Sequence, residues 1–264
     1  MATTIAVLSQ KGGTGETTTV RTLTDVFRRV GLEVLAVDLD PQGNLSDYFD
    51  VPPDASPTVA DVLSGDAKVK AAAHDGIVPA SPILAEVERS LSGKMGRELV
   101  LRKALKDARK QHDIVLVDCP PALGLLTING LVAADWALVS SEAQYFALQG
   151  VQGALEVVEQ PKEYYNPDLE LLGVLMNIAD MRTVHSRDAY VQLKEHFGEK
   201  VFDTVVRASI AYAESAEQAR SILDHRPDLG DDYVALADEI LARIGLTDAR
   251  KQLKPLLANR VQRA

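Results

Sequence analysis

The segment LSQKGGTGETTT, residues 8–19, combines glycines, hydroxyls and charged side chains in an order that suits phosphate binding. A P-loop reads G-x-x-x-x-G-K-[ST]; its backbone N–H groups surround the phosphates and its lysine reaches the β- and γ-phosphates. Gly12, Gly13 and Gly15 supply the turn here, and Thr17 supplies a hydroxyl for Mg²⁺. Glu16, however, stands at the lysine position. The segment predicts a nucleotide-phosphate site without its central positive charge; a glycine-rich turn without a ligand is the alternative.

Three aspartates follow apolar runs of the kind that form buried strands. VLAVDLDPQGN places Asp38 and Asp40 after one run, and DIVLVDCPP places Asp118 after another. Ligands of open α/β sheets gather at the carboxyl ends of the strands, where an acidic side chain commonly supports Mg²⁺. A single aspartate there is usually a turn former. Three of them beside a glycine loop predict a metal-dependent phosphate site.

A sheet has to bring these residues together. Short apolar, β-branched runs alternate with longer segments whose apolar residues recur every three or four positions. The runs are almost continuously hydrophobic, as in strands buried on both faces of a parallel sheet. We therefore expect an α/β fold, with a doubly wound, mostly parallel sheet and helices on both faces. The predicted strands are 3–8, 33–37, 113–117, 136–139, 171–176 and 201–206, and the predicted helices are 17–30 (ending at Gly31), 97–108, 148–159, 184–197 and 233–244.

Composition limits the class of protein. The 264 residues are 46% hydrophobic and 25% charged, as is typical of a globular chain. The single cysteine, Cys119, excludes a disulfide framework, and no apolar run reaches the ~18 residues of a membrane helix. The N-terminal segment has no basic start. The sequence predicts a cytoplasmic protein with one domain over 1–245 and a basic helical tail over 246–264.

The loop and the acidic segments together resemble the ParA/Soj family, within the deviant-Walker P-loop ATPases that include MinD. The family's KGGxGKTT loop matches residues 11–18 at every fixed position except Glu16, and its D-x-DPQGN segment matches residues 38–44. Its second acidic motif matches residues 117–121, and the similarity continues through SSEAQYFALQGV and AYAESAEQARSI to about residue 245. The resemblance implies a dimeric, ATP-dependent switch that positions DNA or large protein cargo, with ATP/ADP and Mg²⁺ as cofactors.

The resemblance also implies a role for each matching residue. Lys11 would act in catalysis by reaching the partner subunit's phosphates, and Asp40 would orient the attacking water. Asn177 would contact adenine; an asparagine that caps the strand end is an equal alternative. The phosphates would be bound by Lys11, Gly12, Gly13, Thr14, Gly15, Thr17 and Thr18, and the metal would be held by Thr17, with Asp38 and Asp118 supporting its shell.

Glu16 is the departure that matters for catalysis. Phosphoryl transfer depends on positioning and electrostatics, so that a missing lysine removes part of the catalytic machinery. One pair of unit charges ~4 Å apart is worth about 4 kcal/mol at an effective dielectric constant of ~20. A carboxylate in place of the lysine is therefore expected to weaken phosphate binding strongly. Because Asp40 and Asp118 are kept, the sequence favours a loss-of-function variant of an active ATPase, introduced or isolated, over a natural pseudo-ATPase.

Positive charge is concentrated toward the C-terminus. Residues 1–180 carry the whole net charge of −10, whereas positive and negative charges balance over residues 181–264. The ATP-bound dimer is expected to bind double-stranded DNA without sequence preference and in a salt-sensitive way. Solvated surface charge is the alternative at each position. The candidate phosphate contacts are Arg182, Arg187, Arg207, Arg220, Arg226 and the basic residues of the tail.

Two other functions can be weighed from the sequence. A MinD-like membrane-cycling ATPase needs a C-terminal amphipathic anchor. One side of the tail carries Leu253, Leu256, Leu257 and Val261 with basic neighbours, but Pro255 and the absence of aromatic residues weaken insertion. A reductase with a bridging iron–sulfur cluster needs two ligand cysteines per subunit, and the chain has only Cys119. The expected partners are a second copy, nonspecific DNA of the nucleoid and a ParB-like or cargo-adaptor protein; the cargo is left open, and a membrane is not expected.

Overall fold

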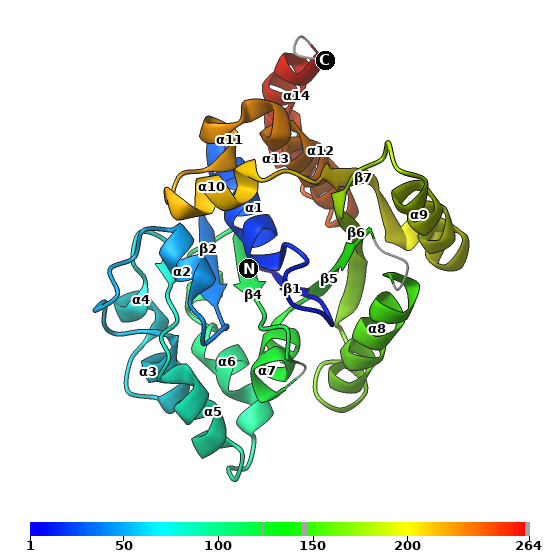
Figure 1. Cartoon of the computed structure of the whole chain (residues 1–264). Coiled ribbons are helices and arrows are strands. Elements are labelled where there is room, and N and C mark those ends of the chain that lie inside the picture. Colours follow the sequence, from blue (N-terminus) through cyan, green and yellow to red (C-terminus); the bar gives the residue numbers. More distant parts are fainter. Residues whose placement is uncertain (123, 144–146, 262–264) are drawn as a thin grey trace.

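The structure is a computed structural model that describes residues 1–122, 124–143 and 147–261. These residues form a seven-stranded sheet in which every neighbouring pair of strands runs parallel. The order is β3-β2-β4-β1-β5-β6-β7, so that β1, which leads into the glycine-rich loop, lies at the centre (Figure 1). The predicted doubly wound α/β fold is confirmed. The strands are β1 (Thr3–Leu8), β2 (Val34–Asp38), β3 (Ile77–Val78), β4 (Ile114–Asp118), β5 (Trp136–Glu142), β6 (Glu170–Ala179) and β7 (Val201–Arg207).

Helices cover both faces of the sheet because alternate residues of a strand enter two separate apolar cores. On β1, Ala6 and Leu8 pack into one core, whereas Ile5 and Val7 pack into the other. Figure 1 shows α1 and α12, which line the second core, above the strands, and α6 to α8, which line the first, below them. The helices are α1 (Glu16–Arg29), α2 (Asn44–Tyr48), α3 (Val59–Ser64), α4 (Val69–Ala72), α5 (Leu84–Leu91), α6 (Val100–Ala104), α7 (Leu125–Ala133), α8 (Ala147–Tyr164), α9 (Val184–Phe197), α10 (Ala211–Glu217), α11 (Ile222–His225), α12 (Pro227–Arg243), α13 (Thr247–Gln252) and α14 (Lys254–Val261), with 3₁₀ turns η1 (Arg97–Leu99), η2 (Ala108–Lys110) and η3 (Gly198–Lys200).

The helix predicted over residues 97–108 is wrong, because the segment is divided into η1, α6 and η2. The side chain of Asn129 causes the first break. Its Nδ2 donates to the carbonyl oxygen of Arg97 at 2.9 Å, and its Oδ1 accepts from the N–H of Leu101 at 3.1 Å. These two backbone groups would bond to each other in a continuous α-helix. The buried amide of Asn129 takes the place of that bond.

The other differences have local reasons. All six predicted strands are present with ends shifted by a few residues, and α1 ends before Gly31, whose φ of 82° confirms the predicted helix stop. Strand β3 was not predicted, because two residues are too few to show a period. Helix α7 was not predicted either. It is buried on almost every side, so its apolar residues show no helical period.

The predicted C-terminal tail is helical as far as residue 261, and residues 262–264 lie outside the described part of the chain. Its apolar side faces the protein. Leu253 is fully buried in the core that also holds α1 and α12, and Leu256 and Leu257 pack against the same core. The leucines that a membrane anchor would have to expose are therefore covered.

Over the described residues, every helix is too short or too polar to cross a lipid bilayer.

Candidate functional site

The glycine-rich loop turns between the end of β1 and the start of α1. Gly13 and Gly15 have φ angles of 80° and 84°, in the left-handed region that side chains other than glycine rarely adopt. A Cβ on Gly15 would also lie 2.5 Å from Nδ2 of Asn177. The loop therefore needs glycine for its backbone shape, and for space at Gly15, and it places the N-terminus of α1 at the carboxyl edge of the sheet.

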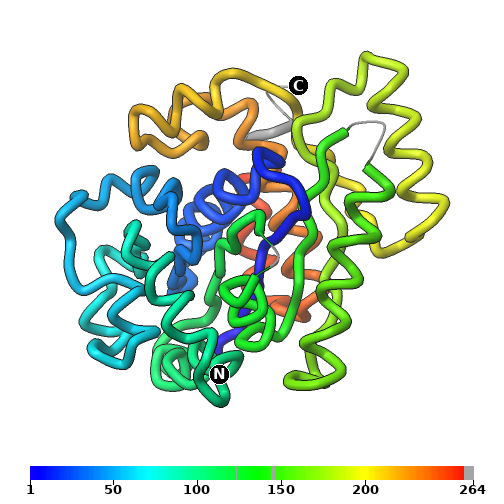
Figure 2. Tube along the Cα trace, turned by 60° about the horizontal axis from the view of Figure 1, so that its bottom comes forward, coloured from blue at the N-terminus to red at the C-terminus, as the bar shows by residue number. Residues whose placement is uncertain are grey.

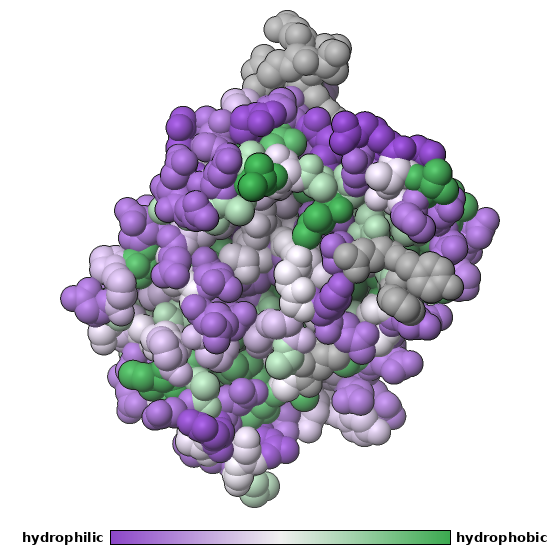
Figure 3. Space-filling view, viewed as in Figure 1, coloured by the Kyte–Doolittle hydropathy of each residue, from purple (hydrophilic) through white to green (hydrophobic). Residues whose placement is uncertain are grey.

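A cavity of about 780 Å³ opens at this edge. Figure 3 views this face of the molecule, where residues of near-neutral hydropathy at the centre are flanked by hydrophobic residues. Ile178, at the end of β6, is 37% exposed and has a φ of 52°, a strained conformation for a β-branched residue that tends to occur at functional sites. The predicted residues that line the cavity are Gly12, Gly13, Gly15, Glu16, Thr17, Thr18, Asp40 and Asn177, joined by Arg207 from the DNA-binding candidates.

Glu16 lies largely beneath the loop, with only 7% of its surface exposed. Its Oε1 makes a short hydrogen bond with Oγ of Ser9, and the same Ser9 hydroxyl lies 2.7 Å from the carbonyl oxygen of Lys11. The Ser9 hydroxyl therefore lies between two acceptors, the Glu16 carboxyl group and the Lys11 carbonyl oxygen. Burial raises the pKa of Glu16, more than the Ser9 contact lowers it, so that its neutral form is favoured relative to that of an exposed glutamate.

This position changes the electrostatic argument made from the sequence. The expected repulsion assumed a charged carboxylate directed at the phosphates. A buried Glu16 with a raised pKa removes the positive charge of the motif and disfavours a full negative charge in its place. Phosphate binding is then weakened more by the loss of the lysine's attraction than by repulsion from Glu16.

Thr17, Asp118 and Asp38 form a row at the ends of α1, β4 and β2. Thr17 Oγ1 donates to Asp118 Oδ2 at 2.8 Å, and Asp38 is paired with Asp118 in the register of the two strands. Asp38 accepts the N–H and the hydroxyl of Ser46 and the N–H of Asp40. Burial raises the pKa of Asp38 to about 6, and burial together with Asp38 raises the pKa of Asp118 well above its ordinary value.

Oδ1 of Asp118 is a buried oxygen without a hydrogen-bond partner among the described residues. A buried carboxylate oxygen without a partner is costly, and a cation or its bound water would satisfy it. Within the described ranges, no group of three or more His, Cys, Asp or Glu side chains forms a metal site. Mg²⁺ nevertheless keeps several waters and needs only one or two carboxylates, so that Thr17 and Asp118 fit this ion.

Asp40 and Lys11 lie on different sides of the loop. Asp40 is half-buried, lines the cavity and accepts the N–H of Gln42 at 2.9 Å. Lys11 is not among the described residues that line the cavity; its side chain is 65% exposed and its Nζ lies 3.4 Å from Oε2 of Glu142. The lysine therefore points away from the phosphate loop of its own chain. Thr14 is buried, and its carbonyl oxygen accepts the hydroxyl of Ser140 at 2.7 Å.

Asn177 lies behind the loop with 2% of its surface exposed. Its Nδ2 is 3.4 Å from the carbonyl oxygen of Gly15 and 3.3 Å from Oγ1 of Thr19. Its Oδ1 accepts the N–H of Ile178 at 3.0 Å. These contacts hold the start of α1 against β6. A contact between Asn177 and adenine stays a prediction.

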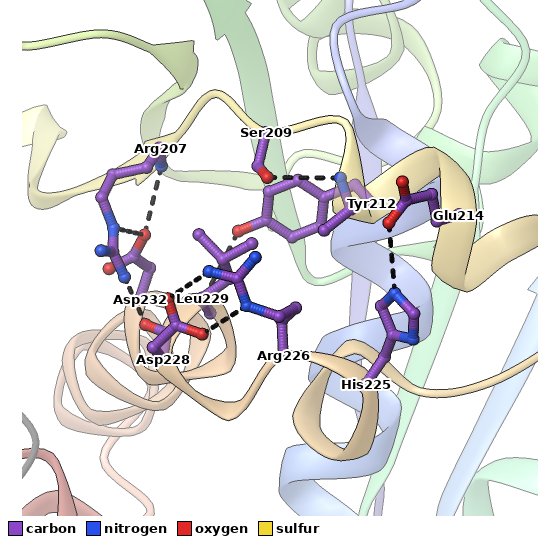
Figure 4. Close-up of polar contacts among 10 residues, drawn as sticks. Arg207, Ser209, Tyr212, Glu214, His225, Arg226, Asp228, Leu229 and Asp232 are labelled. Carbon is purple, nitrogen blue, oxygen red and sulfur yellow. Dashed lines mark hydrogen bonds and ion pairs between the residues drawn. The ribbon is translucent and has the colours of Figure 1, made fainter.

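The DNA-binding candidates do not form one cluster. Arg207 and Arg226 both turn toward Asp228, as Figure 4 shows: Arg226 Nε lies 2.9 Å from its carboxylate, and Arg207 donates to its carbonyl oxygen. Arg207 Nε also pairs with Asp232 at 2.8 Å. Each of these guanidinium groups thus has an acidic neighbour.

The remaining three candidates are also held by local contacts. Arg182 pairs with Asp180 at 2.8 Å, and Arg187 donates to the carbonyl oxygen of Arg182 at 2.8 Å. Arg220 donates to the carbonyl oxygen of Asp224 at 3.0 Å. DNA would have to compete with the carboxylate at Arg182, and to displace backbone contacts at the other two.

Three tyrosines of the cavity wall were missed from the sequence. Tyr48, Tyr212 and Tyr233 come from α2, α10 and α12. The rings of Tyr212 and Tyr233 meet edge to face with centroids 6.1 Å apart, and Tyr48 shares a short hydrogen bond with Ser215. They supply an aromatic wall to a cavity whose other lining residues are partly polar and partly aliphatic. Nothing in their spacing identifies them, since they come from three separate segments.

Comparison with known proteins agrees with this geometry. The AAA domain family matches residues 2–171. The chain is 39% identical over 246 residues to the chromosome-partitioning ATPase Soj of Thermus thermophilus, covering 91% of this chain and 96% of that protein. It is 35% identical over 247 residues to the sporulation initiation inhibitor protein Soj of Bacillus subtilis, covering 90% and 98%. A solved structure of cobyrinic acid a,c-diamide synthase from Mycobacterium smegmatis, with bound ADP and magnesium, is 36% identical, with a TM-score of 0.75 over 85% of this chain and 95% of that chain.

Proposed function

The chain belongs to the ParA/Soj family of P-loop ATPases, and from this premise we propose that it is an ATP-dependent dimerisation switch that binds nonspecific DNA and positions cargo on the nucleoid. The family implies ATPase activity, and its Soj members support a role in partition. The observation that carries the proposal is the convergence of the glycine-rich loop, Thr17 and Asp40 on one cavity, with the buried Asp118 hydrogen-bonded to Thr17.

Each group would have a defined task with MgATP bound. The N–H groups of residues 12–18 and the N-terminus of α1 would hold the phosphates. Thr17 and, through water, Asp118 would hold Mg²⁺, which would neutralise charge on the phosphoryl group. Asp40, half-buried at the cavity wall, would accept a hydrogen bond from the attacking water and so orient it. Lys11 would leave Glu142 to reach the phosphates of a second subunit.

Dimer formation would bury the face that carries the cavity. Two exposed hydrophobic residues lie on this face: Ile178, near the end of β6, is 37% exposed, and Ile210, which follows β7, is 77% exposed. Lys11 already points away from its own loop. A second copy placed over this face would cover the apolar residues and receive the lysine.

Glu16 would make the present form a weak switch. Without the lysine, the cavity has lost the charge that neutralises the transferring phosphoryl group, whether Glu16 is protonated or ionised. Nucleotide binding, dimerisation and DNA binding would all be reduced, because each step depends on the one before it.

The proposal is tested by converting the loop back to the family motif. The Glu16→Lys variant should hydrolyse ATP slowly with Mg²⁺, form a dimer in ATP by light scattering, and bind two unrelated DNA duplexes only with ATP. The present chain should do none of these at a measurable rate or affinity, and Glu16→Gln is the control that removes the carboxylate without adding a charge.

Two outcomes would contradict the proposal. A Glu16→Lys variant without turnover in the presence of Mg²⁺, DNA and its partner protein would rule out an ATPase. Sedimentation with anionic vesicles in ATP, in the absence of DNA binding, would instead favour the MinD-like alternative.

A further inference from the structure

A second cavity, of about 1180 Å³, lies at the opposite edge of the sheet from the ATP site. Its walls are the end of α1 with the start of β2, the segment from α3 through α4, and the α6–η2 segment. In Figure 2 the dark blue glycine-rich loop is above the middle of the view, whereas the cyan segment after α3 and the teal segment around α6 are at the lower left. The residues assigned to ATP and DNA do not line this cavity.

The floor of this second cavity is apolar, and part of its wall is formed by small side chains. Val34, Val62 and Val69 lie at the floor, and all three are buried. Along the α6–η2 segment the lining residues recur every three or four positions, so that one side of the segment faces the cavity. Two of them, Ala104 and Ala108, leave room where a larger side chain would fill it. The cavity therefore exists because the side chains around it are too small to fill it.

The rim is positively charged, although the whole chain has a net charge of −10. Lys68, Lys70 and Lys103 line the cavity, and none of them pairs with a carboxylate of the described residues. Lys110 is different, because it is held by Asp107 at 2.8 Å. Three carboxylates, those of Glu33, Asp75 and Asp107, also line the cavity. Basic side chains still outnumber them, because Arg28, Lys68, Lys70, Lys103 and Lys110 all line the same space.

We propose that this cavity binds an acidic amphipathic helix of a partner protein. A helix with its side chains is about 10–12 Å wide and rises about 1.5 Å per residue, so that a cavity of this volume holds about seven to ten residues. Small ligands fill pockets of about 300–1,000 Å³, which is less. Apolar side chains at i, i+3, i+4 and i+7 would cover the valine floor, and carboxylates on the flanks would reach the lysines.

A nucleic acid does not suit this cavity. Its charged backbone would meet the lysines, but it offers nothing to cover the recessed apolar floor. The proposal rests on this cavity alone and not on the ATP switch. Binding of the helix should therefore be the same with and without ATP, and the same in the Glu16→Lys variant.

The test uses a labelled peptide of about 14 residues, with leucines at helical spacing on one side and glutamates on the other. Fluorescence anisotropy should show saturable binding to the full chain, and no binding of a scrambled peptide or of one with lysine in place of glutamate. The double variant Lys68→Glu, Lys103→Glu should weaken binding by about tenfold or more. The matched control Lys94→Glu, Lys106→Glu changes two exposed lysines that do not line the cavity, and should have little effect.

A second variant tests the cavity by shape and not by charge. Ala104→Leu should fill the space and weaken peptide binding while ATP-site behaviour and thermal stability are retained. Equal binding of the scrambled peptide, or equal loss in both lysine pairs, would overturn the proposal. Displacement of the peptide by millimolar inorganic phosphate would assign the lysines to a small anion, and DNA binding that depends on Lys68 and Lys103 would assign them to nucleic acid.

Discussion

Charged groups in the ATP-site cavity and on the surface formed by α10 to α12 have opposite environments. In the cavity, burial raises the pKa values of Glu16, Asp38 and Asp118, and Asp118 keeps one buried oxygen without a partner in the described structure. On the surface, Asp228 is paired with Arg226, and this pairing lowers its pKa. Asp180 is similar: Arg182 lowers its pKa to about 2.

At the cavity, one buried carboxyl group lacks a full set of partners among the described residues, whereas Asp180 and Asp228 on the surface are paired with arginines. Burying a carboxylate without a partner costs free energy, and the cost is recovered when a ligand or metal completes the site. Exposed ion pairs contribute little stability and leave little positive potential for a polyanion. The cavity therefore suits a ligand, whereas DNA would have to displace existing contacts on the surface.

The largest expected effect is on turnover. In the Glu16→Lys background, Asp40→Ala should lower single-turnover ATP hydrolysis by about 10²- to 10⁴-fold, because the water loses its hydrogen-bond acceptor. ATP affinity should stay the same, since Asp40 would contact the water and not the phosphates. Asp47→Ala, at another carboxylate of the cavity, is the control. If both variants lost the same amount of turnover, hydrolysis would depend on negative charge in the cavity and not on a specific role of Asp40.

The next effect is on ATP affinity. Calorimetry with MgATP should show about hundredfold tighter binding, or about 3 kcal/mol, for Glu16→Lys, because a positive charge then meets the phosphates. Glu16→Gln should gain much less, since it brings no positive charge to the phosphates. Equal gains in the two variants would mean that repulsion by an ionised Glu16 is the dominant effect.

Glu16 should also make stability depend on pH. Its pKa is raised in the folded protein, so the folded state holds its proton more tightly than the unfolded state does. This contribution is fully present below the ordinary value of 4.5 and is lost as the pH rises through the folded pKa. Glu16→Gln should therefore be more stable than the parent by about 1–3 kcal/mol at pH ~8 and equal to it near pH ~4, by urea unfolding. If the two proteins differed in free energy of unfolding by the same amount at every pH in this range, the pH dependence would not come from Glu16.

The smallest effect is expected on DNA. In the Glu16→Lys background with ATP, replacing Arg220 and Arg226 by alanine should weaken DNA binding by about three- to tenfold and reduce its salt dependence. The effect should be modest because both side chains are already held by Asp224 and Asp228. Arg89→Ala with Arg102→Ala is the control away from this surface. A loss of more than hundredfold would show that these two residues dominate the DNA interface.

The sequence by itself determined the architecture and the composition of the ATP site. Buried parallel strands are short apolar runs, and each run can be recognised without its neighbours, so the six longer strands could be predicted. Helix α1 could be predicted from its own helical period. Because parallel strands end at one edge, Asp38, Asp40 and Asp118 could be expected beside the glycine loop before any contact was known. The order of the strands and their parallel direction then confirmed that expectation.

Only the tertiary structure decided what depends on residues far apart in the chain. The break before α6 comes from Asn129, whose amide takes the place of a helix hydrogen bond. Asn129 is nearly thirty residues away along the chain, so the apolar periodicity of residues 97–108 cannot reveal the break. The raised pKa of Glu16 comes from its burial, and the pairing of Arg207 comes from Asp232 on another element. The second cavity exists because three segments meet around small residues, a property of their packing that no one segment carries.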